Sequence, residues 1–128
     1  MGSFKELTVY KKAFQLAMEI FELTKLFTPE EKFALPSQLR RSSRSVCRSI
    51  GEAYRKRMYP NFFVSKVSNA DMENSETQIS LNFANSCGYI SNEVNDKLQS
   101  DSGEIGKLLN HMMSYPEKYQ RNKNNHIS

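Results

Sequence analysis

The sequence predicts an all-α protein folded as an antiparallel, up-down-up-down four-helix bundle. Apolar residues recur at intervals of three and four in four long stretches, and proline or glycine separates these stretches. No stretch carries a clear strand signal. Because 128 residues fit one domain, we expect the bundle over residues 1–115 and a disordered tail over residues 116–128.

The first predicted helix spans residues 6–27, which contain neither glycine nor proline. Its apolar side chains form two adjoining stripes that cover about 200° of the helix, whereas a bundle helix needs roughly 100°. The stripes consist of Leu7, Tyr10, Phe14, Ala17, Met18 and Phe21, and of Val9, Ala13, Leu16, Ile20, Leu23 and Phe27. This helix is therefore expected to be the most buried element or to contact another subunit.

A second helix is predicted over residues 36–57, with Pro36 in its first turn. Its core-facing seam is expected at Leu35, Leu39, Ser42, Val46, Ser49, Ile50 and Ala53. Before it, Thr28, Pro29 and Glu31 have the spacing of a capping box, which predicts a short helical turn.

The third helix is predicted from Pro60 to Cys87, with Gly88 just past its end. One apolar stripe contains Phe63, Val67, Ala70, Thr77, Leu81 and Ala84, and Asn74 interrupts it. A weaker stripe of Met72, Ile79 and Phe83 lies on the far side. Because one packing contact does not need both stripes, we infer that helices 6–27 and 60–87 build a subunit interface.

Ser91 is the expected N-cap of the fourth helix, and Pro116 ends it. Its seam is predicted at Ile90, Val94, Leu98, Asp101, Ile105, Leu108 and Met112. The last twelve residues, EKYQRNKNNHIS, lack an apolar pattern, and they make up most of the expected tail.

Positive charge is concentrated in one segment. Residues 40–57 contain seven arginines and lysines against one glutamate, so they carry +6, and the rest of the chain carries −2 of the total of +4. Such local basicity indicates a site for an anionic partner. The chain has no apolar run long enough for a membrane span and no signal peptide, and its cysteines Cys47 and Cys87 form no CxxC motif. We expect a cytoplasmic protein with free thiols that does not bind a membrane.

The arginines of this segment share one helix face. On a helical wheel Arg40, Arg41, Arg44, Arg48 and Arg55 fall within about 100°, nearly opposite the seam, and Gly51 lies among them. Arginines four residues apart repel each other, and a polyanion would offset that repulsion. The planar guanidinium group also matches phosphate geometry, and Gly51 would let a backbone approach closely.

No catalytic constellation is found, so we expect no enzyme, no cofactor and no metal site. His111 and His126 are isolated, and Glu73 and Glu76 lack the histidine partners of bundle di-metal sites. Cys47 borders the arginines, which would favour its thiolate. A small packed thiol is the alternative interpretation of Cys47.

Several segments resemble the small bacterial four-helix bundle proteins first noticed as reading frames in intervening sequences of 23S ribosomal RNA genes. The resemblance rests on the segments FKELTVYKKAFQLAMEIFELTKLF, SQLRRSSRSV and SETQISLNFANSCGYI, and on the final helix. It implies a homopentamer, a basic surface that faces nucleic acid, and no enzyme. The family's Arg-Arg pair corresponds to Arg40 and Arg41.

The chain departs from the family pattern after this arginine pair. The family usually has Ser-Ile-Pro-Ala-Asn-Ile-Ala-Glu-Gly, whereas this chain has Ser-Val-Cys-Arg-Ser-Ile-Gly-Glu-Ala from Ser45 to Ala53. Loss of the proline predicts a straighter helix, and Arg48 adds charge. The polar residues Asn74 and Ser75 are expected to weaken the packing of the third helix.

Two functions remain open. In the first, the protein is a non-enzymatic oligomer that binds nucleic acid, RNA rather than DNA, through the phosphate contacts of Arg40, Arg41, Arg44, Arg48 and Arg55. Only Tyr54 and Tyr59 lie near these arginines in sequence, so base stacking is not expected. In the second, the protein is an interaction scaffold, and its basic face meets an acidic partner or a neighbouring subunit.

Overall fold

The four periodic stretches form four helices in the computed structural model, which describes residues 3–28 and 34–120. The long helices are α1 (Thr8–Thr24), α2 (Leu35–Arg55), α3 (Pro60–Ser86) and α4 (Asn92–Ser114). Short 3-10 helices, η1 (Phe4–Glu6) and η3 (Pro116–Lys118), flank them. The predicted all-α, four-helix fold is confirmed.

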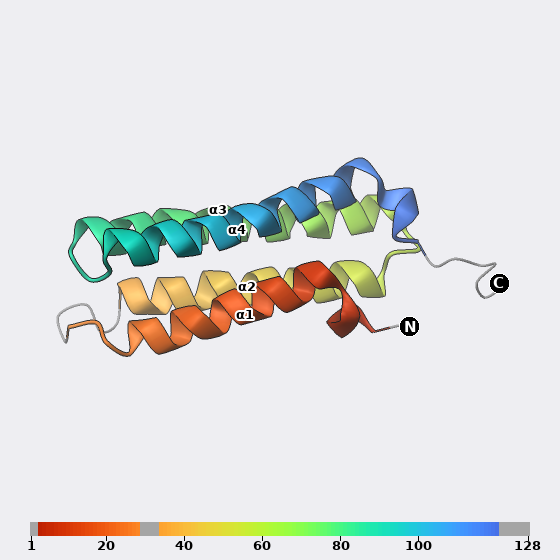
Figure 1. The fold of residues 1–128 in the computed structure, drawn as a ribbon. Helices are drawn as coiled ribbons and strands as arrows, with labels where there is room; N and C mark the ends of the chain where they lie inside the picture. The colour runs from red at the N-terminus through yellow and green to blue at the C-terminus, as the bar shows by residue number, and fades with distance from the viewer. Residues whose placement is uncertain (1–2, 29–33, 121–128) are drawn as a thin grey trace.

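The helices pack in two layers, with α1 beside α2 and α3 beside α4 (Figure 1). Further contacts join α2 to α3 and α1 to α4, so the helices follow one another around the bundle. As a result, α1 and α3 lie at opposite corners. The short helix η1, the end of α2, the start of α3 and η3 all lie at one end of the bundle (Figure 1).

Most helix ends lie close to the predicted positions. Pro60 begins α3, Gly88 adopts the left-handed conformation (φ 83°) just after it, and the Ser91 side chain accepts a hydrogen bond from the Val94 amide. The exception is α1, predicted over residues 6–27. It begins at Thr8 because Leu7 has extended backbone (φ −67°, ψ 135°), and it ends at Thr24. The preceding η1 is capped by the side chain of Ser3.

The seam predicted for α4 is partly wrong. The buried positions are Asn95, Leu98, Ser102, Ile105, Leu109 and Met112. Asp101 lies instead at the edge of the helix, where its carboxylate is 2.8 Å from Lys97 Nζ. Burying this carboxylate without a partner would be costly, whereas the Ser102 hydroxyl finds a partner inside the bundle.

Polar residues of the core are hydrogen-bonded across the helices. Asn74, only 2% exposed, donates through Nδ2 to the Ser102 carbonyl (2.9 Å) and accepts from the Ser102 hydroxyl (2.8 Å). The hydroxyls of Ser42 and Thr77 share a bond of 2.7 Å between α2 and α3. The expected weakness at Asn74 is therefore not found, because its amide is satisfied.

The segment expected to be a disordered tail begins with ordered structure. Pro116–Lys118 forms η3, and the Tyr119 ring stacks on Phe63 with centroids 5.9 Å apart. Apolar periodicity does not predict this order, because one aromatic residue of the segment, Tyr119, makes the contact. Residues 121–128 and the Pro29 and Glu31 part of the predicted turn lie outside the described residues.

Substitution Asn74→Ala is expected to lower the free energy of unfolding by about 1–3 kcal/mol, because the buried Ser102 hydroxyl loses its acceptor. Urea denaturation followed by circular dichroism measures this change. The matched control is Asn69→Ala on the same helix, at a half-buried position, and its effect should stay within about 0.5 kcal/mol. Equal effects of the two substitutions would contradict the role given to Asn74.

Candidate nucleic-acid interface

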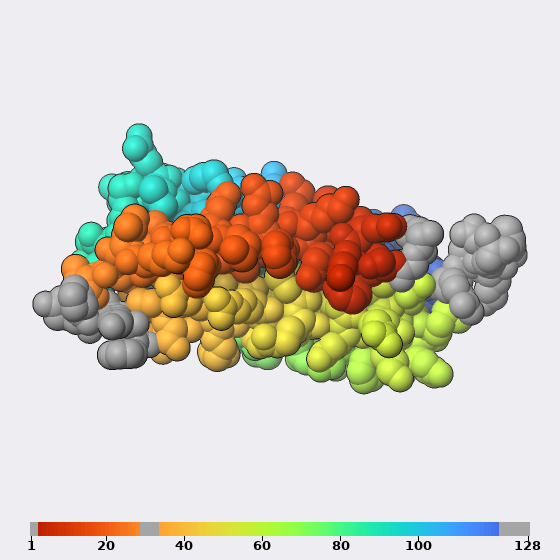
Figure 2. All heavy atoms as spheres, turned by 90° about the horizontal axis from the view of Figure 1, so that it is seen from below, coloured from red at the N-terminus to blue at the C-terminus, as the bar shows by residue number. Residues whose placement is uncertain are grey.

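The outer surface of α2 lies between α1 and the start of α3 (Figure 2). Its inner surface buries small and apolar side chains, among them Leu39, Ser42, Ser43 and Ala53. This burial fixes the rotation of α2 and directs the arginines outwards. Ser49, predicted to lie in the seam, is only half-buried.

Arg44, Arg48 and Arg55 are the exposed arginines of this surface that form no ion pair with another described residue. We refer to these three residues as the basic face of α2. Their spacing of four and seven residues corresponds to about 6 and 10.5 Å along the helix axis. Arg48 donates to the Ser45 hydroxyl at 2.9 Å, a contact within its own helix.

Arg40 is used within the bundle. Its Nε donates to the Thr24 hydroxyl (2.8 Å), and its guanidinium carbon lies 4.9 Å from the centre of the Phe21 ring. The Arg44 guanidinium carbon lies 5.7 Å from the same ring. Arg40 therefore holds α2 against α1 and is less available to a ligand than predicted.

Arg41 faces two glutamates of α3. Its guanidinium nitrogens lie 3.9 Å from Glu73 Oε1 and 3.7 Å from Glu76 Oε1. Both distances exceed hydrogen-bond length. Glu73 Oε1 is buried and has no hydrogen-bond partner among the described residues. Burial and the neighbouring Glu76 charge raise the pKa of Glu73, while Arg41 lowers it to a smaller extent.

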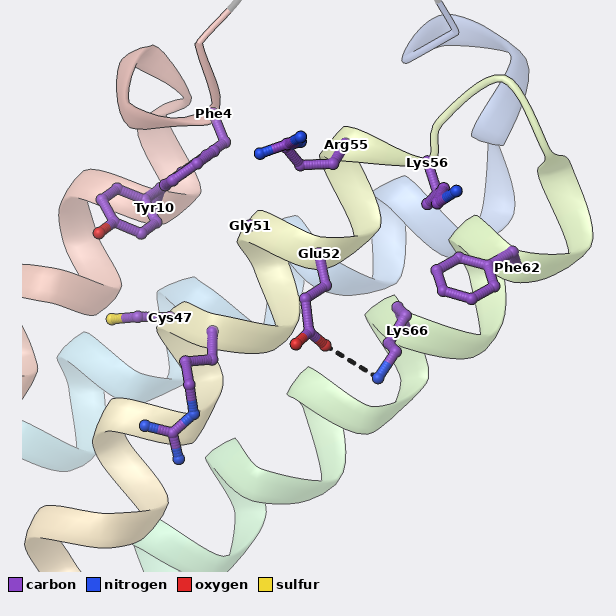
Figure 3. Close-up of a pocket in the computed structure, with 10 residues that line it drawn as sticks. Phe4, Tyr10, Cys47, Gly51, Glu52, Arg55, Lys56, Phe62 and Lys66 are labelled. Atoms are coloured by element: carbon purple, nitrogen blue, oxygen red, sulfur yellow. Dashed lines mark ion pairs between the residues drawn. The ribbon is translucent and has the colours of Figure 1, made fainter.

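A groove of about 660 Å³ lies where η1, the end of α2 and the start of α3 meet (Figure 3). Arg48 and Arg55 of the basic face line it together with Lys56, Glu52 and Lys66. Three aromatic side chains, Phe4, Tyr10 and Phe62, also line it. Within the groove, Lys66 Nζ lies 2.8 Å from Glu52 Oε1, so the only acidic group of the lining is paired.

Gly51 does not have the predicted role in this groove. It is buried, and a Cβ at this position would lie 3.5 Å from the Phe4 ring. That distance is an ordinary van der Waals contact, so Phe4 of η1 covers Gly51 and occupies the place expected for the backbone of a ligand.

Cys47 also lines the groove, and its environment favours the packed alternative. Burial raises the pKa of the Cys47 thiol to about 11, which exceeds the opposing effect of the Arg48 charge. The thiol therefore stays protonated at neutral pH and is a poor nucleophile.

The structure thus brings together part of the predicted site. Arg44, Arg48 and Arg55 share one open surface, whereas Arg40 and Arg41 contact α1 and α3. Lys66, Phe4 and Phe62 are not among the predicted site residues, because they come from other elements. Lys56 could have been found, because it follows Arg55 in the same basic segment.

Other candidate chemistry is sparse over residues 3–28 and 34–120. No group of three His, Cys, Asp or Glu side chains there could hold a metal ion. His111 is exposed, and its Nδ1 lies 2.8 Å from the Tyr119 hydroxyl. Among the helices of these residues, none has the length and apolar character needed to cross a membrane.

Comparisons with known proteins identify a family and a similar solved structure. The family model described as 23S rRNA-intervening sequence protein matches residues 5–111. A crystal structure of a protein of unknown function from the S23 ribosomal protein family of Bacteroides thetaiotaomicron has a TM-score of 0.75 and 30% sequence identity. That match covers 83% of this chain and 98% of the other. Among curated proteins, none matches. The family match includes all of α2 and therefore the basic face.

The raised pKa of Glu73 predicts a pH-dependent stability. The folded state binds this proton more tightly than the unfolded chain, so stability falls as pH rises from 4.5, the usual value, through the raised pKa. We expect Glu73→Gln to raise the melting temperature relative to the unsubstituted protein at about pH 7, and much less at about pH 4. Thermal unfolding at both values measures this, with Glu117→Gln as the control at an exposed position. An equal gain at both pH values would contradict the assignment.

Proposed function

The chain belongs to the 23S rRNA-intervening sequence protein family, and from this premise we propose that it is a non-enzymatic, oligomeric bundle that binds RNA through the basic face of α2. The observation that carries the proposal is the exposure of Arg44, Arg48 and Arg55 without an acidic partner among the described residues. Phosphate groups would supply the missing negative charge and match the guanidinium geometry.

RNA is favoured over DNA by the link of the family's description to ribosomal RNA. In an A-form helix the major groove is too narrow for side chains to read, so recognition depends on phosphates, riboses and unpaired bases. Arginines along one face of a helix suit contacts of this kind, which position a strand without reading its sequence. The free thiols of Cys47 and Cys87 support action in the reducing cytoplasm.

Exposed apolar side chains support the oligomer. Phe14 and Met18 of α1 are 52% and 44% exposed, and Met72, Ile79 and Phe83 of α3 are 55–60% exposed. Large apolar patches of this kind mark interaction surfaces. Because α1 and α3 lie at opposite corners, a contact between α1 of one copy and α3 of the next is head-to-tail. Such contacts form a ring when the rotation from copy to copy closes on itself. The pentamer implied by the family resemblance is one such ring.

Binding to a labelled RNA should weaken as salt increases. For three phosphate contacts, the slope of log affinity against log salt is expected to be about −2 to −3. In the double variant Arg44→Ala, Arg48→Ala, the slope should move toward roughly −1, because each lost phosphate contact removes about one unit. The control is the double variant Lys11→Ala, Lys107→Ala, which removes the same charge from exposed positions on α1 and α4. An affinity that does not change with salt would rule the proposal out.

Substitution Phe83→Glu should dissociate the oligomer into monomers of 14.8 kDa without unfolding the bundle, because the Phe83 ring is exposed in the single chain. Light scattering during size-exclusion chromatography measures the mass, and circular dichroism checks the fold. Tyr59→Glu is the control, since Tyr59 is 63% exposed but lies between α2 and α3. A monomeric mass for the unsubstituted protein would contradict the oligomer.

A further inference from the structure

The groove at the end of α2 combines features that the proposed backbone contacts do not need. Its volume of about 660 Å³ lies within the usual range of small-ligand sites. Residues of four elements, η1, α1, α2 and α3, line it, with Phe4 on one side and Phe62 and Lys66 on the other (Figure 3). Phosphate contacts alone would require cations, but no aromatic walls.

The charges of the groove favour an anion. Four cationic side chains and one acidic side chain line it, so an excess of three positive charges remains. Glu52 Oε1 lies 2.8 Å from Lys66 Nζ, so the one carboxylate of the lining is already paired within the protein. Arg48, Arg55 and Lys56 form no ion pair with other described residues. Because Arg48 and Arg55 also belong to the basic face, the groove continues that face toward the end of the bundle.

The aromatic side chains provide a surface for a flat ring. The Phe62 ring is 43% exposed, although it belongs to the first turn of a well-packed helix. On the other side, Phe4 lies against Gly51 and meets Tyr10 edge-to-face, with centroids 5.1 Å apart and planes at 72°. The Phe4 wall is thus fixed by packing, whereas Phe62 stays open to solvent. Proteins that bind single strands combine cationic grooves with exposed aromatic rings in this way.

We propose that this groove holds one nucleotide of an unpaired RNA strand, with its base against the Phe62 ring and its phosphate near Arg48 and Arg55. The inference rests on the proposed RNA binding and adds a preference for unpaired strands over duplexes. A base in a duplex is stacked on its neighbours and cannot enter the groove, while its phosphates still reach the basic face.

The test compares a labelled single-stranded RNA of roughly ten nucleotides with the duplex of the same sequence. Phe62→Leu keeps an apolar side chain but removes the ring, and it should weaken single-strand binding by about five- to tenfold, the lower end of the effect of one stacked base. Phe62→Tyr keeps the ring and should retain affinity. Tyr115→Leu, which removes an exposed aromatic ring after α4, is the control. Duplex binding should be the same in all four proteins.

An independent readout uses the absence of tryptophan from the sequence. The variant Phe62→Trp places the only indole of the chain in the groove, and its fluorescence should be quenched by the single strand but not by the duplex. The inference is overturned if Phe62→Leu binds the single strand as tightly as the unsubstituted protein, or if both RNAs quench equally.

The two proposals can fail separately. If Phe62→Leu has no effect while the double variant Arg44→Ala, Arg48→Ala loses affinity for both RNAs, the groove assignment is wrong and RNA binding stands. If the unsubstituted protein binds neither RNA, both are wrong. If Phe62→Leu instead changes the oligomer mass, the groove receives a segment of a neighbouring copy, and the nucleotide assignment is overturned.

Discussion

The packing of α2 between α1 and α3 is the constraint on which the rest of the structure depends. Small side chains, Ser42, Ser43 and Ala53, form much of its buried surface. The two serine hydroxyls find partners, since Ser42 bonds to Thr77 of α3 and Ser43 donates to the Leu39 carbonyl at 2.7 Å. With this side buried and satisfied, the arginines can only face outwards. Repulsion between them is the cost of the arrangement, and a bound polyanion would relieve it.

The basic surface changes in character along α2. Near the start of the helix, Arg40 and Arg41 contact α1 and α3 through Thr24, Glu73 and Glu76. Toward the other end, Arg48 and Arg55 reach the groove with its aromatic walls. Arg40 and Arg41 therefore stabilise the bundle, while Arg48 and Arg55 are open to a ligand. Glu73, whose buried Oε1 has no hydrogen-bond partner among the described residues, marks the boundary between them.

The helices could be predicted from the sequence because their signals are local. Pro60, Gly88 and Ser91 act at single helix ends, and each lies where the pattern predicts it. The buried side of α4 could not be predicted as well, because the choice between Asp101 and Ser102 depends on Asn74 of another helix. For the site, the wheel places the arginines on one face, but it cannot tell which of them meet partners from α1 and α3. The groove escaped prediction because Phe4 and Phe62 approach α2 only in the folded bundle.

The most direct measurement of the central claim is hydroxyl-radical footprinting of the protein with and without single-stranded RNA, read by mass spectrometry. If the basic face and its groove form the contact surface, RNA should protect Phe4, Cys47 and Phe62, which line the groove. Phe14 and Phe83, which lie outside it on α1 and α3, should keep the reactivity that they have without RNA. RNA-dependent protection of these two side chains, with unchanged reactivity at Phe62, would place the RNA elsewhere and contradict the account.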